Sequence, residues 1–263
     1  AMLSMTPSLT VKNASRMKDM ALDPRSVGEA LKVDSVLTGT VRQSGAQLRV
    51  TVKLVNTKTE ENIWASTFDK SESDIFSVQR EIAQKVVEGL KLKLGEGQQD
   101  LIVNRQTKDL EAYNLYINGR KMWKTRTREG MRDSIEKFEL ALSKDPKFAL
   151  AYVGIADAYN QLVMYGHSPP EVSFPKAKDE LKKALALNDS ISEAHASLGF
   201  ISWVYDWNWD AAEKSLNKAL SINPNYPDAR RWLSHVHITM GNISSALEEI
   251  DKGIKLEPNS GNM

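Results

Sequence analysis

One pattern of apolar and small residues occurs four times in the C-terminal half of the sequence. The clearest copy places Ala246, Ile250 and Gly253 at helical spacings of four and three and closes at Pro258. The preceding copy closes at Pro224, 34 residues earlier. A period of this length, with the apolar residues on one face of each helix, predicts stacked helix pairs. Because proline lacks an N–H and cannot continue a helix, each closing proline is expected to begin the turn into the next pair.

The pattern can be followed upstream through the other copies. Its second-helix positions are Ser134, Phe138, Ala141 and Pro146; Ala177, Leu181, Ala184 and Asp189; and Ala212, Leu216, Ala219 and Pro224. One position of each first helix holds a small residue, because a bulky side chain there would force the paired helices apart. These small residues are Gly119, Ala156, Gly199 and Ser234. The inter-helix connections Lys124–Gly130 and Tyr165–Pro175 are expected to be longer than the pattern requires.

On these residues the sequence resembles the tetratricopeptide repeat family, over roughly 150 of its 263 residues. The resemblance implies an all-α solenoid over residues 110–263. Its four helix pairs are expected at about 112–146, 149–189, 192–224 and 227–258. In that family the first helix of each pair lines a concave face, and the resemblance therefore implies binding of a protein or peptide there.

Positions two, five, nine and twelve of each first helix face the concave side in this family, if the small residue is counted as the eighth. The partner-binding residues expected on this count, with one neighbour, are Tyr113, Tyr116, Arg120, Trp123, Asp157, Asn160, Gln161, Phe200, Trp203, Arg231 and His235. Tyrosine, tryptophan and arginine dominate the energetics of protein interfaces. An alternative stays open, in which some of these aromatic residues, above all Trp123 and Trp203, belong to the core between helices.

The N-terminal half has a different apolar period. Between residues 35 and 69 the period changes from about 3.6 to 2, and alternating Leu48, Val50, Val52 and Leu54 indicate a half-buried strand. Flanking segments are expected to form two more strands, at Val36–Gln43 and Ile63–Phe68, joined by turn clusters. The fold class predicted here is an α+β domain built on an antiparallel meander, over residues 1–95, with a linker over residues 96–109.

Two helices are expected beside this meander. The first runs from Pro24 to Leu31, with the proline in its first turn and Asp23 as its cap. The second runs over Ser73–Leu94 and presents an apolar stripe that is expected to pack on the sheet. An unpaired strand edge near Leu9–Lys12 would be able to pair with another chain. Homodimerisation through the N-terminal domain is therefore one hypothesis.

The run from Leu37 to Gly45, together with Trp64 and the pair Phe68-Asp69, resembles a TolB-N-terminal-like or FlgO-like α/β domain of bacterial signalling proteins. In that family the domain often follows an adenylate-cyclase, kinase or winged-helix domain, and a further strand and helix usually begin it. The resemblance implies a piece of a longer regulatory protein, as does the leading Ala1. The alternative function is a sensory fragment of a larger enzyme, with a small-molecule site between the sheet and the Ser73–Leu94 helix.

Composition excludes several classes of chemistry. The sequence has no cysteine, so thiolate catalysis, disulfides and zinc fingers are ruled out. A net charge of +1 does not favour direct nucleic-acid binding, and no apolar run of membrane-spanning length occurs. No motif of a hydrolase, metalloprotease or nucleotide-binding loop appears. No enzymatic activity, cofactor or metal is expected of this chain, and the compartment stays open between cytoplasm and periplasm.

Two polar runs are candidate ligand sites. Asp206 to Asp210 alternates oxygen ligands as a calcium loop does, but the required glycine and glutamate are missing. We expect Asp210 and Glu213 to form a helix capping pair instead, with Trp207 and Trp209 filling the seam between helices. A basic run from Arg120 to Arg132 could hold an acidic peptide, although a solvated turn is the more ordinary interpretation.

Overall fold

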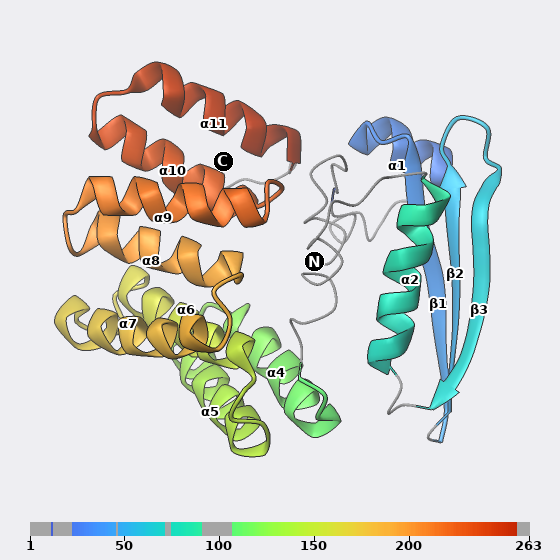
Figure 1. The fold of residues 1–263 in the computed structure, drawn as a ribbon, viewed down its shortest axis with the longest axis horizontal. Helices are drawn as coiled ribbons and strands as arrows, with labels where there is room; N and C mark the ends of the chain where they lie inside the picture. The colour runs from blue at the N-terminus through green and yellow to red at the C-terminus, as the bar shows by residue number, and fades with distance from the viewer. Residues whose placement is uncertain (1–11, 13–22, 46, 72–74, 91–106, 257–263) are drawn as a thin grey trace. The chain divides into compact units, whose positions relative to one another are not determined.

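In a computed structural model of the protein, residues 12, 23–45, 47–71, 75–90 and 107–256 are described. They form two compact units, one around a three-stranded sheet and one made of helices (Figure 1). The edge strand predicted at Leu9–Lys12 and most of the predicted linker fall outside the described residues, so both stay predictions.

The sheet confirms the predicted antiparallel meander. Its strands β1 (Ser35–Ser44), β2 (Gln47–Asn56) and β3 (Asn62–Ser71) lie in the order β1-β2-β3. The alternating residues predicted on β2 share one buried face, and their exposed fractions are 8% or less. The helix α2 (Ile75–Gly89) packs against β2 and β3. It ends earlier than the sequence predicted, because Leu90 already lies in a turn.

The space between α2 and the sheet is filled by side chains. Val78 and Val86 of α2 are only 1% and 2% exposed. Val78 packs in one cluster with Leu48, Val50, Val52 and Phe68. Apolar packing of this kind stabilises the unit but leaves little room for a ligand. The described residues therefore speak against the small-molecule site that the sensor alternative places there.

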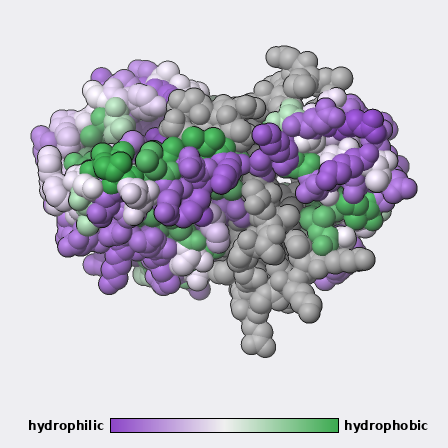
Figure 2. Space-filling model, turned by 90° about the horizontal axis from the view of Figure 1, so that it is seen from above, coloured by the Kyte–Doolittle hydropathy of each residue, from purple (hydrophilic) through white to green (hydrophobic). Residues whose placement is uncertain are grey.

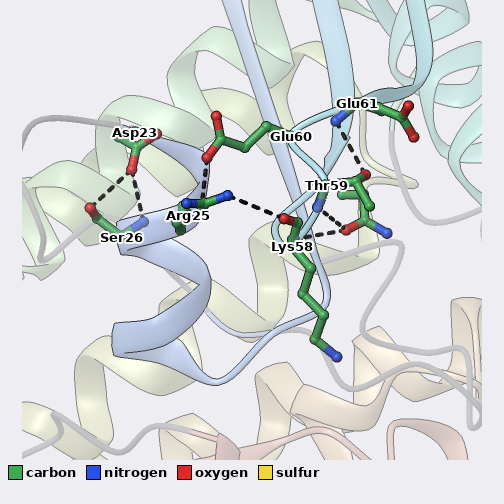
Figure 3. Close-up of polar contacts among 8 residues, drawn as sticks. Asp23, Arg25, Ser26, Lys58, Thr59, Glu60 and Glu61 are labelled. Atoms are coloured by element: carbon green, nitrogen blue, oxygen red, sulfur yellow. Dashed lines mark hydrogen bonds and ion pairs between the residues drawn. The ribbon is translucent and has the colours of Figure 1, made fainter.

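Polar contacts hold the first turn of the helix α1 (Pro24–Leu31) in place (Figure 3). The carboxylate of Asp23 accepts hydrogen bonds from the backbone N–H and the hydroxyl of Ser26, both at 3.0 Å, as predicted for its cap. From the first turn, Arg25 forms an ion pair of 2.9 Å with Glu60 and donates to the carbonyl of Lys58. These contacts tie α1 to the turn between β2 and β3.

The helical unit confirms the predicted repeat architecture. Eight helices follow one another in the described residues: α4 (Leu110–Trp123), α5 (Arg128–Lys144), α6 (Ala149–Met164), α7 (Pro170–Leu187), α8 (Ser192–Val204), α9 (Trp209–Ile222), α10 (Pro227–Thr239) and α11 (Ile243–Leu256). They stack as consecutive pairs (Figure 1). We call the first member of each pair an A helix (α4, α6, α8, α10) and the second a B helix (α5, α7, α9, α11).

Both connections that were expected to be long end earlier than the sequence interpretation placed them. The helix α5 begins at Arg128, because Thr127 caps it by accepting a hydrogen bond from the N–H of Gly130. The helix α7 begins at Pro170, where the fixed backbone angle of proline suits the first turn. Pro175 therefore lies inside α7 rather than before it. The sequence interpretation, which placed the end of the loop at Pro175, was wrong here.

The predicted Asp210–Glu213 cap is also wrong, because the N-cap of α9 lies two residues before Asp210. Asn208 is the N-cap, and its side chain accepts a hydrogen bond of 3.1 Å from the N–H of Ala211. Trp209 packs into the apolar cluster beside α9, as predicted. Trp207 does not fill a seam, since it is 75% exposed and its backbone φ is 54°.

Replacement of Asn208 by alanine tests this cap. We expect the free energy of unfolding of the helical unit to fall by about 1 kcal/mol, because the N–H of Ala211 loses its partner. The Asp210→Ala variant is the matched control and should cost less, because Asp210 contributes only through the helix dipole. Urea unfolding followed by circular dichroism measures both. An equal or larger loss for Asp210→Ala would contradict the assignment.

Candidate partner-binding face

The A helices contact one another along one side of the helical unit, which we call the A-helix face. Three successive A helices are joined there by one carboxylate. Asp157 of α6 accepts a hydrogen bond of 3.1 Å from the guanidinium of Arg120 on α4. Its other oxygen accepts one of 2.6 Å from the hydroxyl of Ser197 on α8. The side chain of Asp157 is therefore a fixed polar link between the first three repeats.

Charged and phenolic groups surround this link. Burial raises the pKa of Asp157, and Arg120 opposes the shift without cancelling it. Burial lowers the pKa of Arg120. The electrostatic interactions with Tyr116, Asp157 and Tyr226 raise it by more, so the pKa lies above its usual value. The pKa of Tyr226 lies well above its usual value, first because of burial and then because of nearby carboxylates. The link thus keeps an arginine charged within a poorly hydrated part of the face.

Next to the link, a tryptophan and two amides are short of partners. The guanidinium of Arg120 lies over the ring of Trp123, 4.3 Å from its centroid, in a cation–π contact. The Nε1 of Trp123, the Oδ1 of Asn160 and the Oε1 of Gln161 are buried and have no hydrogen-bond partner among the described residues. Such groups each cost free energy until a partner is supplied. All three atoms are shielded by their surroundings, so a partner reaches them only after a side chain moves.

The last two repeats supply an aromatic cluster. Phe200 of α8 lies 5.1 Å from Trp232 and 6.3 Å from Trp203, measured between ring centroids. Trp203 stacks on His235 at 5.3 Å with an interplanar angle of 4°. Its indole N–H donates to the hydroxyl of Thr239 at 3.0 Å. The rings are held in fixed orientations across α8 and α10, which limits the entropy that a partner must remove on binding.

Two cationic or titratable residues border this cluster on α10. Arg231 forms an ion pair of 2.8 Å with Asp228 and lies 5.8 Å from the centroid of Trp232. The pKa of His235 is lowered, first by burial and then by the charge of Arg231. A lowered pKa keeps the stacked imidazole neutral near pH 7, so its charge does not disturb the stacking with Trp203.

The structure separates the predicted residues: Arg120 and Asp157 meet, as do Trp203 and His235, but others pack into the core. Tyr116 packs 5.0 Å from Phe148 and 5.6 Å from Phe138, between ring centroids, and burial raises its pKa to about 12. Tyr113 packs against the same apolar cluster of the first repeat. Phe200 is 4% exposed. These three rings contribute to the core between helices, so truncating them changes packing as well as the face.

Sequence reasoning missed several members of the face. Ser197 binds the central carboxylate, and Trp232 and Thr239 complete the aromatic cluster. Their repeat positions lie outside the four that were counted as inward.

Other surfaces are separate from the A-helix face. Figure 2 shows an apolar band on the helical unit, and the exposed apolar residues of α11 are Ile243, Leu247 and Ile254. They lie on a B helix. In the basic run, Arg120 belongs to the link with Asp157, whereas Lys124 and Arg126 of the following turn and Arg128 at the start of α5 are exposed. Among the described residues there is no cluster of metal-binding side chains and no helix with the length and hydropathy of a membrane span.

Two segments of the chain match the models of known protein families. Residues 208–263 match the model of the tetratricopeptide repeat. Residues 1–85 match the model of the HilA/YgeH-like transcriptional regulator, second domain. The chain therefore combines tetratricopeptide repeats with an N-terminal HilA/YgeH-like domain. The narrower resemblance to a TolB-N-terminal-like or FlgO-like domain stays a prediction.

One curated relative is "Putative adenylate cyclase 3" from Rhizobium meliloti (strain 1021), which is 27% identical over 188 residues. The match covers 69% of this chain but only 31% of that relative, so the chain is a distant homologue of about a third of it. Among solved structures, TTC0263, a tetratricopeptide protein of Thermus thermophilus, is 21% identical with a TM-score of 0.48, over 71% of this chain and 88% of its own. MamA is 27% identical with a TM-score of 0.39, over 51% and 73%.

Proposed function

We propose that this chain is a non-catalytic interaction module that binds an extended peptide, or an extended segment of a protein, on the A-helix face. The observation that carries the proposal is the row of polar and aromatic side chains that successive A helices bring together. Arg120, Trp123 and Trp203 are of the types that dominate binding energy in interfaces. The match to tetratricopeptide repeats supports the same function.

The chemistry of the face favours a main chain as the ligand. An extended peptide presents N–H donors and C=O acceptors at regular intervals. Once side-chain movement exposes them, the buried unpartnered oxygens of Asn160 and Gln161 can accept hydrogen bonds from such a main chain, and the indole N–H of Trp123 can donate one. Gln161 is only partly buried, so rotation of its side chain brings its oxygen to a ligand. The fixed rings of Trp203 and His235 then pack against an apolar side chain of the peptide.

A random peptide library, screened against the whole chain, tests this proposal. The variant Gln161→Ala with Arg231→Ala removes one unpartnered acceptor and one cation beside the aromatic cluster. We expect it to weaken the best selected peptide by at least about tenfold, which corresponds to about 1.4 kcal/mol. Fluorescence anisotropy with the labelled peptide measures the dissociation constants.

The matched control is Lys121→Ala with Lys137→Ala, which changes two lysines outside the A-helix face. It should bind the peptide as tightly as the unchanged chain, and circular dichroism should show both variants folded. If no peptide is selected, or if the two double variants bind equally well, the A-helix face is not the binding surface.

The N-terminal half suggests the biological process in which the chain takes part. We propose that the chain is the regulatory part of a bacterial signalling protein, either a transcriptional regulator or an adenylate cyclase. The description of the model matching residues 1–85 and the name of the R. meliloti relative support this interpretation. The test is to measure transcription or cyclase activity of a full-length protein with and without the bound peptide. A regulatory module must change that activity when its peptide binds.

A further inference from the structure

Exposed apolar side chains gather at one edge of the helical unit. Each A helix is joined to its B helix by a turn, and we call the edge formed by these four turns the A–B turn edge. Because A helices run towards this edge and B helices run back from it, α4 begins and α11 ends at the opposite edge. The turns of the third and fourth pairs lie at the left of the helical unit in Figure 1. Met164, Tyr165, Trp207 and Ile243 lie in or directly beside the turns and are 60%, 42%, 75% and 55% exposed.

One residue in each of these turns has a positive φ. The second and fourth turns use Gly166, with a φ of 70°, and Gly241, with a φ of 80°, and glycine adopts such angles without a steric penalty. The first and third turns use Arg126, with a φ of 58°, and Trp207, with a φ of 54°, whose β-carbons make these angles unfavourable. Glycine would therefore form the same turns at a lower cost. Because backbone strain is concentrated at functional sites, the side chains of Arg126 and Trp207 point to a role beyond folding.

The third turn holds Trp207 in a defined position. On one side of it, the carboxylate of Asp206 accepts a hydrogen bond of 2.5 Å from Lys178 of α7. On the other side, Asn208 caps α9 and donates its N–H to the carbonyl of Ser202 at 3.0 Å. The backbone is therefore fixed before and after Trp207, while the indole ring is exposed to solvent. A ring presented in this way needs little ordering of the backbone when it binds.

The first turn adds positive charge to the same edge. Lys124, Arg126 and Arg128 are exposed there, with Glu129 as their acidic neighbour. Packed helices lie about 8–10 Å apart, so the first turn and Trp207 in the third turn are on the order of 20 Å apart along the edge. The edge thus combines exposed apolar and aromatic side chains with a basic flank. An anionic bilayer surface matches both properties, because its headgroup region accepts amphipathic rings and its phosphates attract lysine and arginine.

We propose that the A–B turn edge binds the surface of a bilayer that contains anionic phospholipids. Trp207 and Tyr165 enter the headgroup region, and the basic turn at Arg126 faces the phosphate groups. A soft surface suits this edge better than a folded protein does, because the apolar side chains stand on separate turns with exposed polar residues such as Asn208 and Asn242 beside them. The proposal does not depend on the A-helix face.

Co-sedimentation of the whole chain with vesicles tests the proposal. We expect binding to vesicles of phosphatidylcholine and phosphatidylglycerol in equal parts, weaker binding to phosphatidylcholine alone, and a smaller difference at high salt. Trp207→Gly should lower the partition coefficient by at least about tenfold, because the bilayer no longer buries the indole ring. Glycine suits a φ of 54°, so urea unfolding should show this variant to be at least as stable as the unchanged chain. The control Leu187→Ala removes an exposed apolar side chain at the opposite edge and should bind normally.

The basic turn has a matched test. The variant Lys124→Ala with Arg126→Gly removes two cations from the first turn. It should weaken binding to the vesicles that contain phosphatidylglycerol and leave the weak binding to phosphatidylcholine unchanged. The control Lys147→Ala with Lys255→Ala removes two exposed cations at the opposite edge and should bind as the unchanged chain does.

Tryptophan fluorescence locates the ring in the bilayer. Brominated phospholipids quench a tryptophan that enters them, and Trp207→Phe keeps an apolar ring in the turn without the indole. This variant should still bind, but its fluorescence should be quenched less than that of the unchanged chain. Equal quenching, or equal binding by Trp207→Gly, would overturn the proposal. So would the absence of binding to the anionic vesicles, which would leave a protein as the partner of this edge.

Discussion

Replacing Phe138 with alanine is expected to lower the free energy of unfolding of the helical unit by about 3–5 kcal/mol, the usual range for a large aromatic residue in a core. Phe138 of α5 is completely buried. A β-carbon added at Gly119 of α4 would lie 2.6 Å from its ring, and one added at Gly154 of α6 would lie 2.7 Å from it. The ring therefore touches the backbones of two A helices, and its loss leaves a cavity that neither rigid backbone can fill.

The position of Phe138 between the first two repeats increases the destabilisation expected from its loss. In a repeat protein each unit is stabilised mainly by its direct neighbours. Phe138 connects the first repeat to the second and also packs 5.6 Å from the ring of Tyr116. We therefore expect the first pair of helices to unfold before the rest in the Phe138→Ala variant. Hydrogen exchange should show lost protection in α4 and α5 at denaturant concentrations where α8 and α9 are still protected.

The control for this variant is Leu140→Ala on the same helix. Leu140 is 40% exposed, so its truncation should cost less than about 1 kcal/mol. Urea unfolding of both variants, followed by circular dichroism, gives the two losses. Equal losses would mean that the packing of Phe138 between the two glycines does not hold the first repeats together.

The repeat architecture could be predicted because it rests on local rules. Ala246, Ile250 and Gly253 follow helical spacing, and the closing prolines mark the period. Residues of β2 alternate with a period of two, which allows only one face to be buried. Such patterns depend only on residues close together in the sequence, so they can be recognised without knowing the contacts between distant segments. The fold class followed from them, and the structure confirmed it.

The starts of individual helices could not be predicted as well. The sequence interpretation ends a loop at Pro175, although Pro170 begins α7 five residues earlier. Both prolines fit the first turn of a helix on local grounds. The choice is settled by the burial of Ser173 and Phe174 against neighbouring helices, at 1% and 2% exposed. The sequence does not show which residues of a segment will meet a partner far along the chain.

The contacts of the A-helix face could not be predicted from the sequence either, because they join residues that are far apart in the chain. Counting repeat positions placed Arg120 and Asp157 on one side, and they do meet there. It could not reveal that Ser197, 40 residues further on, binds the same carboxylate. Nor could it separate Tyr116, which packs into the core, from Trp203, which stacks on His235. Those distinctions depend on the exact offset between successive repeats.

Removal of the central carboxylate is the second change for which we expect a large effect. Asp157→Ala should lower the free energy of unfolding by about 2–4 kcal/mol, because Arg120 then keeps its charge without a partner. The estimate lies slightly below that for fully buried pairs, since the side chain of Arg120 is 31% exposed. The hydroxyl of Ser197 loses its acceptor in the same variant. Asp133→Ala, at an exposed position of α5, is the control and should be nearly neutral.

The same residue gives stability a defined dependence on pH. Burial raises the pKa of Asp157 in the folded chain above its ordinary value of 3.8. The folded state therefore binds a proton at pH values where the unfolded state has released it. By linkage, the contribution of this group to stability falls as pH rises from the unfolded pKa through the folded one, and it recovers on acidification.

Comparison with Asp157→Asn isolates this contribution, because asparagine cannot titrate, keeps one oxygen to accept from Arg120, and can donate its NH₂ to the hydroxyl oxygen of Ser197. The difference in unfolding free energy, unchanged chain minus variant, should decrease as pH rises through that window and become constant above it. Urea unfolding at a series of pH values measures the difference. A difference that grows with pH would mean that Arg120 outweighs burial, and that the carboxylate is held charged by its ion pair rather than strained by its surroundings.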